Sequence, residues 1–395
     1  MSKLLVLGAG PFQVSGIKKA VALGHEVITA DYTTDGIGHR FSSQRVDCST
    51  TDIAGILGIA TELEVDGICT FASDVAVPAV AHACTELELP GVPEPAARTM
   101  AFKHRFRRFQ HEHGLPHPHF ANGRVLEELG SIADFTWPLI VKPVDTSGSR
   151  GVIKVIEPSM DAVARAFTAA KEFSRSGMVC VEEFVRGTEV GGDAIVVDGK
   201  TAFIAITRKY LDGFVVTGHS LPAAINAHAQ AMVVNALESC CVALGNITGV
   251  INFDVMVDEG RTCVLEMSPR TGGNGIPAII THATGVDPEI ATIQLALGQP
   301  IETTPARATQ GAASWVFGSR SAGILQHLNG ADEVRRYVPE LLELHQTTPQ
   351  GSTVEPFMHG GTLLGYALFE CPSPNHYRSI VSRIEDALQL AVGSP

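Results

Sequence analysis

The sequence lacks the features that mark membrane-spanning, disulfide-linked and nucleic-acid-binding proteins. No stretch approaches the roughly 18 consecutive apolar residues of a transmembrane helix. The eight cysteines include no CxxC pair, and several lie inside apolar runs, as is typical of reduced thiols in a cytosolic protein. A formal net charge of −13 argues against a nucleic-acid-binding protein. We therefore expect a cytoplasmic protein with neither membrane nor nucleic acid as a partner.

The chain is long for a single hydrophobic core, and its composition is that of a globular protein. A length of 395 residues favours two or three domains. The sequence is 45% apolar and 18% charged, which is typical of a well-packed soluble protein and not of a disordered or fibrous one. The apolar run in Met1–Gly8 reaches a glycine at once, so it predicts a first core strand and not a signal peptide.

Residues 1–95 alternate short apolar strands with helical patterns. The predicted strands are Leu4–Leu7, Glu26–Ala30 and Val65–Phe71, and the predicted helices are Ser15–Leu23 and Asp74–Leu87. This alternation indicates an α/β domain in which helices cover a parallel sheet. The Pro- and Gly-rich segment Leu89–Pro95 predicts the end of this domain.

Residues 96–300 follow a different pattern, in which tight turns join successive strands. The predicted helices are Met100–His113, Met160–Phe173 and Ala227–Leu244, and the predicted strands are Pro138–Val144, Gly151–Ile156, Val179–Phe184, Gly192–Val197, Thr201–Thr207, Val250–Val257 and Thr262–Met267. Antiparallel pairs dominate such a pattern, which indicates an α+β domain. After the break at Gly298–Pro300, residues 301–395 are expected to form a smaller α+β region that closes with a helix at Tyr377–Leu390.

The strongest local signal is the segment Pro138–Val152. A strand delivers Lys142, a loop of small residues follows at Thr146–Gly151, and a second strand turns back. The backbone N–H groups of such a loop can surround phosphate oxygens, and glycine lets them approach closely. The segment is not a P-loop, because it lacks GxxxxGK[ST] and joins two strands. The alternative is a hairpin with a flexible tip and an incidental lysine.

Two further segments carry carboxylates at suggestive positions. In Val181–Ala194, Glu182 and Glu183 end a strand and Glu189 follows a turn, so backbone and carboxylate groups could face an adenosine. The alternative there is an ordinary acidic hairpin. In Gly249–Arg270, two apolar strands each carry one acid, Asp254 or Glu266. Buried carboxylates need partners, and this pair suits Mg²⁺ that bridges nucleotide phosphates, although both acids could instead face solvent.

Two other motifs could indicate a dinucleotide site or a zinc site, but their residues fit those patterns less well. Gly8-Ala9-Gly10 follows the first strand, but position 13 is Gln13, so the dinucleotide-binding pattern GxGxxG fails. A zinc site could use a set of four histidines, His111, His113, His117 and His119. Glu112, Gly114 and the nearby prolines place them on a helix end and an irregular loop, where solvated histidines are the simpler interpretation.

In this order and spacing, the three segments resemble the ATP-grasp superfamily. The resemblance covers nearly the whole chain: Leu5–Gln13, Thr29–Tyr32, Ser73–Asp74 and Leu89–Gly91 look like the N-terminal domain of its carboxylase-like branch, and Glu266–Pro277 is similar to the magnesium-and-substrate motif of that branch and of its amino-acid ligases. It implies an ATP-grasp fold with an N-terminal pre-ATP-grasp domain at 1–95, an ATP-grasp domain at 96–300 whose lid subdomain spans about 115–190, and a small C-terminal region at 301–395.

The resemblance also implies roles for individual residues. ATP phosphates would be bound by Lys103 and Lys142, under a closing loop that includes Ser147, Gly148, Ser149 and Gly151. The adenine hinge would be formed by Glu182, Glu183, Phe184 and Val185, the ribose would be held by Glu189, and the metal ligands would be Asp254 and Glu266. Arg270 would contact the reacting carboxylate or acyl phosphate, and the substrate would be faced by His219, on a substrate-side loop, with Gly272 and Gly273. Lys142 and Arg270 would be the catalytic cations.

The sequence departs from the family pattern at two positions. Many members carry Asn as a third metal ligand where this sequence has Ser268, and serine binds a metal only weakly or through water. Asp254 occupies a position where many members have Glu. The first departure leaves the coordination of a second metal ion open.

The activity that the resemblance implies is an ATP- and Mg²⁺-dependent ligase, with Mn²⁺ as a substitute metal, that activates a small-molecule carboxylate as an acyl phosphate and joins it to an amine. Bicarbonate activation through carboxyphosphate is the alternative, although the chain has no Met-Lys-Met biotin-carrier motif and no second ATP-grasp unit. A non-catalytic ATP-binding regulatory protein is a further alternative, which retention of both Asp254 and Glu266 disfavours. A homodimer is the commonest assembly for such an enzyme.

Overall fold

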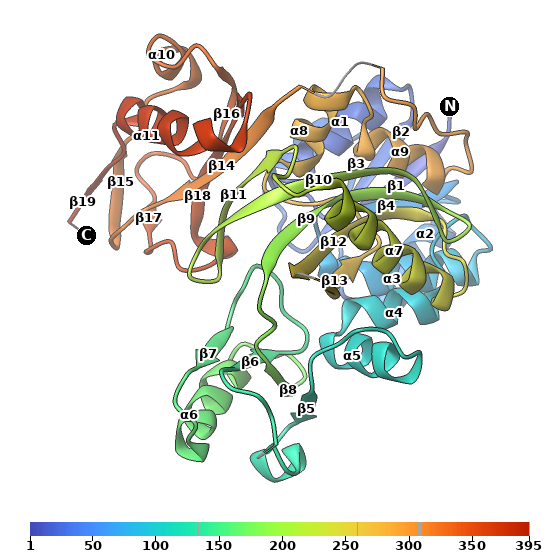
Figure 1. Cartoon of the computed structure of the whole chain (residues 1–395). Coiled ribbons are helices and arrows are strands. Elements are labelled where there is room, and N and C mark those ends of the chain that lie inside the picture. The colour runs from blue at the N-terminus through green and yellow to red at the C-terminus, as the bar shows by residue number, and fades with distance from the viewer. Residues whose placement is uncertain (133, 259, 307–309, 395) are drawn as a thin grey trace.

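The N-terminal part of the chain forms a parallel sheet covered by helices, as predicted. The computed structural model describes residues 1–132, 134–258, 260–306 and 310–394 (Figure 1). The sheet has the order β3-β2-β1-β4, and all its pairs are parallel. Its elements are β1 (Lys3–Leu7), α1 (Val14–Ala22), β2 (Glu26–Asp31), a 3₁₀ turn at Ile37–Phe41, β3 (Gln44–Asp47), α2 (Ile53–Glu62), β4 (Gly67–Thr70), a 3₁₀ turn at Asp74–Ala76 and α3 (Val77–Glu86).

The helix predicted over Met100–His113 is divided into two. The structure has α4 (Glu94–Ala101) and α5 (Lys103–Glu112), with Phe102 between them in an extended conformation (φ −120°, ψ 116°). The amide of Lys103 donates to the carbonyl of Val144 at 3.0 Å, across to the strand that carries Lys142. The break therefore places Lys103 at the first turn of α5, beside the loop that follows Lys142.

A small antiparallel sheet with one covering helix lies within residues 115–190, the segment predicted to be the lid. Its strand order is β5-β8-β6-β7, and in Figure 1 it projects away from the rest of the molecule. The elements are β5 (Phe120–Gly123), a 3₁₀ turn at Leu126–Leu129, β6 (Leu139–Pro143), β7 (Ile153–Val155), α6 (Met160–Lys171) and β8 (Val179–Glu183). Val141, Val163, Phe167 and Val181 are fully or almost fully buried between helix and sheet, so the lid has a core of its own.

The largest sheet is antiparallel and joins strands from both sides of residue 300. Its order is β13-β12-β9-β10-β11-β14-β18-β16. The elements are β9 (Thr188–Val197), β10 (Lys200–Asp212), β11 (Val215–Leu221), α7 (Ala227–Ala243), β12 (Gly249–Asp258), β13 (Arg261–Ser268), α8 (Ile276–Thr284), α9 (Pro288–Ala296), β14 (Ala312–Gly318), β16 (Leu341–Gln346) and β18 (Leu363–Glu370). Because β11 pairs with β14, the sheet is continuous across the predicted boundary near residue 300, and the division into domains stays a prediction.

The remaining elements complete the C-terminal region. They are β15 (Gly323–His327), α10 (Ala331–Arg335), β17 (Thr353–Val354), 3₁₀ turns at Gly360–Thr362 and Pro374–His376, α11 (Tyr377–Leu388) and β19 (Ala391–Gly393). The closing helix ends two residues earlier than predicted, because Gln389 adopts a left-handed conformation (φ 47°). In the part of the chain that the structure describes, no helix is both long and apolar enough to cross a membrane.

Alternation along β12 explains how a core strand can also present polar groups. Phe253 and Val255 are buried and pack with Met267 against α7, in a cluster that includes Val233 and Leu237. The residues between them, Asn252 and Asp254, point to the opposite face of the sheet and are only half-buried. A shift of one residue in register would exchange these two sets, so the packing of Phe253 determines where Asp254 points.

We therefore expect Phe253→Ala to destabilise the fold by about 3–5 kcal/mol, because a fully buried aromatic ring is lost and a cavity remains. The measurement is the urea dependence of unfolding. Val242→Ala, at a position on α7 that is 43% exposed, is the matched control and should change stability by less than about 0.5 kcal/mol. Equal effects of the two substitutions would contradict this account of the core.

Candidate active site

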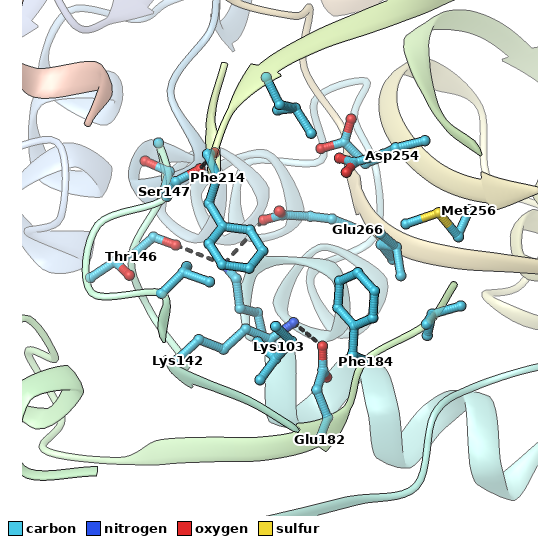
Figure 2. A pocket seen from close by; sticks show the side chains of 18 of the residues that line it. Lys103, Lys142, Thr146, Ser147, Glu182, Phe184, Phe214, Asp254, Met256 and Glu266 are labelled. Carbon is cyan, nitrogen blue, oxygen red and sulfur yellow. Dashed lines mark hydrogen bonds and ion pairs between the residues drawn. The ribbon is translucent and has the colours of Figure 1, made fainter. Parts of the chain in front are cut away.

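A cavity of about 150 Å³ lies between the lid sheet and the large sheet (Figure 2). The lining residues that the sequence predicted are Lys103, Lys142, Ser147, Gly148, Ser149, Glu182, Glu183, Phe184, Val185, Glu189, Asp254 and Glu266. They come from α5, β6, β8, β9, β12, β13 and the loop after β6, which are far apart in the chain. Gly151 follows the same loop but does not line the cavity. The fold thus brings almost all the predicted nucleotide-binding residues to one place.

Lys142 is held in this cavity by a buried charge network. Its ammonium group donates to one oxygen of Glu182, and Arg107 Nε donates to the other oxygen at 2.9 Å. Arg107 is 0% exposed and also donates to the Leu265 carbonyl at 3.0 Å. Burial by itself would raise the pKa of Glu182, but the charges of Arg107 and Lys142 outweigh it and lower that pKa to about 2. The Glu182 side chain is therefore committed to Lys142, which leaves only its backbone for an adenine hinge.

The hinge segment itself is fixed by backbone hydrogen bonds. The amide of Glu183 donates to the His119 carbonyl and that of Phe184 to the Pro138 carbonyl, each at 3.0 Å. Figure 2 shows Phe184 and Met256 on one side of the cavity with Phe214 across from them. Apolar walls of this kind suit a flat aromatic base.

Asp254 and Glu266 are directly opposite each other on β12 and β13. Their side chains are 27% and 35% exposed, and each is paired with a lysine: Lys209 Nζ lies 2.7 Å from Asp254 Oδ2, and Lys103 Nζ lies 3.2 Å from Glu266 Oε1. Two adjacent carboxylates facing a cavity fit Mg²⁺, which prefers oxygen ligands and takes its others from phosphates and water. Ser268 is 2% exposed and lines neither this cavity nor the one beside Arg270, and among the described residues no set of three His, Cys, Asp or Glu side chains could enclose a metal.

Lys209 is a site residue that the sequence analysis missed. Its Nζ also lies 2.7 Å from Glu189 Oε1, so this one ammonium group bridges the acids predicted to hold ribose and metal. Burial would lower the pKa of Lys209, but Asp254 and Glu189 raise it, so the lysine is charged. The only signal in the sequence is alternation along β10, which puts Thr207 and Lys209 on one face and exposed Arg208 on the other.

A second cavity, of about 340 Å³, adjoins the first and has Arg270 in its wall. The two cavities share Ser147, Gly148, Ser149, Arg150, Lys209, Asp254 and Glu266. Arg270 is held by Asp74, whose Oδ1 accepts from Nε at 2.8 Å, and by Asn252, whose Oδ1 accepts from Nη1 at 2.8 Å. A rigid guanidinium in a cavity wall is suited to a carboxylate.

His219 lines the second cavity, but the prediction that it lies on a loop was wrong. It is part of β11, is 2% exposed, and has Nδ1 at 3.0 Å from Thr207 Oγ1. Burial first and the charge of Lys209 second lower its pKa to about 3, so the imidazole is neutral at physiological pH. The loop prediction failed because β11 forms a hairpin with β10, in which His219 pairs with Lys209, and also pairs with β14, almost 100 residues further along the chain.

The two predicted substrate-side glycines have different surroundings. Gly273 lines the second cavity, whereas Gly272 does not. The amide of Gly272 donates to the buried carboxylate of Asp193 at 2.9 Å, and Asn252 Nδ2 donates to the same oxygen at 2.9 Å. Burial raises the pKa of Asp193 to about 6 against these hydrogen bonds. Asp193, which the sequence analysis also missed, thus ties the segment after Arg270 to β9.

Comparison with known proteins identifies the domain at the centre of this arrangement. Residues 102–274 match the model of the ATP-grasp domain, which confirms for this part of the chain the resemblance predicted from the three motifs. The whole chain shares its fold with an L-amino acid ligase from Bacillus licheniformis (TM-score 0.83, 20% identity, 100% of this chain and 99% of that one). It also matches a phosphoribosylglycinamide synthetase from Anaerococcus prevotii (TM-score 0.78, 17% identity, 99% and 100%).

Relatives found by sequence match a smaller share of their own length. An uncharacterized protein, y4rH, of Sinorhizobium fredii is 24% identical over 368 residues, which are 89% of this chain and 74% of that protein. Human carnosine synthase 1 is 27% identical over 265 residues, which are 60% of this chain. The match covers only 31% of the carnosine synthase, so the chain corresponds to about a third of that protein.

The charge network around Glu182 predicts a pH dependence of stability. Because the pKa of Glu182 is lowered in the folded state, its ion pairs stabilise the fold above the ordinary pKa of about 4.3 and are lost as the pH falls toward 2. We expect Glu182→Gln to cost about 3–5 kcal/mol at pH 7, since it leaves buried cations unpaired. The difference from wild type should shrink between pH 5 and pH 3 in urea unfolding experiments.

The control for this experiment is Glu157→Gln, at an exposed position of the lid. It should leave the stability unchanged within about 0.5 kcal/mol at each pH. A difference between Glu182→Gln and wild type that stays constant from pH 7 to pH 3 would contradict the charge network.

Proposed function

We propose that the protein is an ATP- and Mg²⁺-dependent ligase that activates a carboxylate as an acyl phosphate and joins it to an amine. The observation that carries this proposal is the pair of adjoining cavities. The first is lined by the residues predicted to bind the nucleotide, the second has Arg270 in its wall, and both include Lys209, Asp254 and Glu266. A phosphoryl group that passes from ATP to a carboxylate has to cross such a boundary.

In this scheme the nucleotide occupies the first cavity. Lys142 and Lys103 bind its phosphates, the backbone of Glu183–Val185 contacts the adenine, and Glu189 contacts the ribose. The substrate carboxylate lies in the second cavity against Arg270, close to Gly273 and neutral His219. Its oxygen attacks the γ-phosphorus in line, so the protein contributes mainly positioning and charge neutralisation and needs no nucleophile of its own.

Mg²⁺, or Mn²⁺ in its place, would be held by Asp254 and Glu266 and would neutralise the charge that develops on the phosphates. Lys103 and Lys209, which pair with these acids in the structure, would then be free to contact phosphate oxygens. Residues 147–150 line both cavities, and a loop closed there would exclude water from a hydrolytically fragile acyl phosphate.

The names of the relatives favour an amine as the acceptor. Two of them are an L-amino acid ligase and a carnosine synthase, and both names describe the joining of amino acids or their derivatives. Bicarbonate is the competing substrate, because a structure of similar fold holds MgADP and bicarbonate. A cytoplasmic homodimer remains a prediction. All eight cysteines are free thiols in the structure.

The direct test is ADP release across a panel of the twenty L-amino acids, singly and in pairs, and bicarbonate, with mass spectrometry of the products. We expect ADP to form with at least one carboxylate–amine pair, together with an amide product. ADP release with bicarbonate alone would favour carboxyphosphate chemistry instead. No ADP release under any condition would favour a regulatory ATP-binding protein.

Glu266→Gln tests the proposed metal site. We expect turnover to fall by at least about 10³-fold with the fold intact, because the substitution removes one of two anionic metal ligands where charge develops. Glu172→Gln, at the end of the lid helix α6, is the matched control and should turn over like wild type. Near-wild-type ADP release by Glu266→Gln with an unchanged urea midpoint would overturn the assignment.

A further inference from the structure

A third cavity, of about 350 Å³, opens between the N-terminal helices and the lid. Its walls come from the beginnings of α2 and α3, the end of α4, and lid residues 145–146 and 175–176. Ile53, Val75, Ala101 and Phe102 line it with half-buried apolar side chains. We call the first cavity, proposed for ATP, the nucleotide cavity, and the second, with Arg270 in its wall, the carboxylate cavity. None of these four residues lines either of them.

The three cavities meet at Glu266, whose side chain lines all of them. Lys103 lines the nucleotide cavity and the third cavity, and Asp74 lines the carboxylate cavity and the third cavity. Two ion pairs therefore stand at the junction: Lys103 with Glu266 at 3.2 Å, and Arg270 with Asp74 at 2.8 Å between Nε and Oδ1. The third cavity ends where the other two adjoin.

A carboxylate–amine ligase has to bring three reactants to one point. The nucleotide and the carboxylate account for two cavities, and residues 147–150 line both of these but not the third. The approach that is left to a nucleophile comes from the side of Asp74 and Glu266. We propose that the third cavity admits the acceptor amine, an inference that rests on the proposed ligase function.

The chemistry of the junction suits this role. Asp74 and Glu266 bring carboxylate oxygens to the junction that can accept a hydrogen bond from an arriving amine, and the apolar walls favour an amine with an apolar substituent. After the ammonium group has given one proton to solvent water, the nitrogen lone pair forms the bond to the acyl carbon while the bond from that carbon to the phosphate oxygen breaks. An acyl phosphate and a neutral amine become an amide and hydrogen phosphate, which carries away the proton that nitrogen loses.

Variants that block the third cavity should affect the acceptor amine and leave the binding of the other two reactants unchanged. Ile53→Trp fills it from the first turn of α2, and Ala101→Phe fills it independently from the end of α4. With the best carboxylate from the amino-acid panel, we expect either variant to raise KM at least tenfold for the L-amino acid that wild type couples fastest. Hydroxamate formation with hydroxylamine, a nucleophile small enough to pass, should stay within twofold of wild type, as should the Kd for MgATP.

Leu57→Trp is the matched control, on the same helix as Ile53 but lining none of the three cavities, and it should leave the KM of the amine unchanged. The inference is overturned if both blocking variants bind MgATP normally and keep a wild-type KM for the amine. It is also overturned if they lose amide and hydroxamate formation equally, since the block would then act on activation. A wild-type enzyme that forms no hydroxamate with any carboxylate contradicts the proposed ligase function itself.

Discussion

The contact on which the rest of the site depends is the ion pair between two almost completely buried side chains, Arg107 and Glu182. It connects α5 to β8, and through the Arg107 bond to the Leu265 carbonyl it also reaches β13. The same carboxylate accepts from Lys142, so the lid strands, the helix that begins at Lys103 and the strand that carries Glu266 are tied together at one acid. Because buried charges are stable only with partners, none of the three side chains can move independently.

The acids Asp254 and Glu266, which lie opposite each other, also depend on paired cations. Asp254, Glu266 and Glu189 would repel one another in a narrow cavity, and Lys209 and Lys103 offset that charge before any nucleotide arrives. A nucleotide with its metal brings both signs of charge, so it can exchange partners with these ion pairs without leaving a buried charge alone. These ion pairs therefore suit the highly charged nucleotide of the proposed function.

Under the proposed function, the arrangement of the cavities would let one scaffold serve several ligation reactions. The nucleotide cavity is built from the lid and the large sheet, whereas the carboxylate cavity also uses residues near the ends of N-terminal strands, such as Asp74. The third cavity draws mostly on N-terminal helices. Changes in those helices would alter the acceptor and leave the phosphate chemistry intact, which agrees with a fold shared among ligases of different names.

Sequence patterns by themselves determined the parallel N-terminal sheet, the lid hairpin with Lys142, and the pair Asp254 and Glu266. Each depends on neighbours in the chain: strand–helix alternation, a turn between two strands, or one acid in an apolar run. Only the tertiary structure decided the roles of Lys209, Arg107 and Asp193, whose partners Glu189, Glu182 and Gly272 lie 20, 75 and 79 residues away, and it placed His219 in a strand between β10 and β14. A local pattern can specify which face of a strand a side chain occupies, but packing between distant segments determines which charge it meets there.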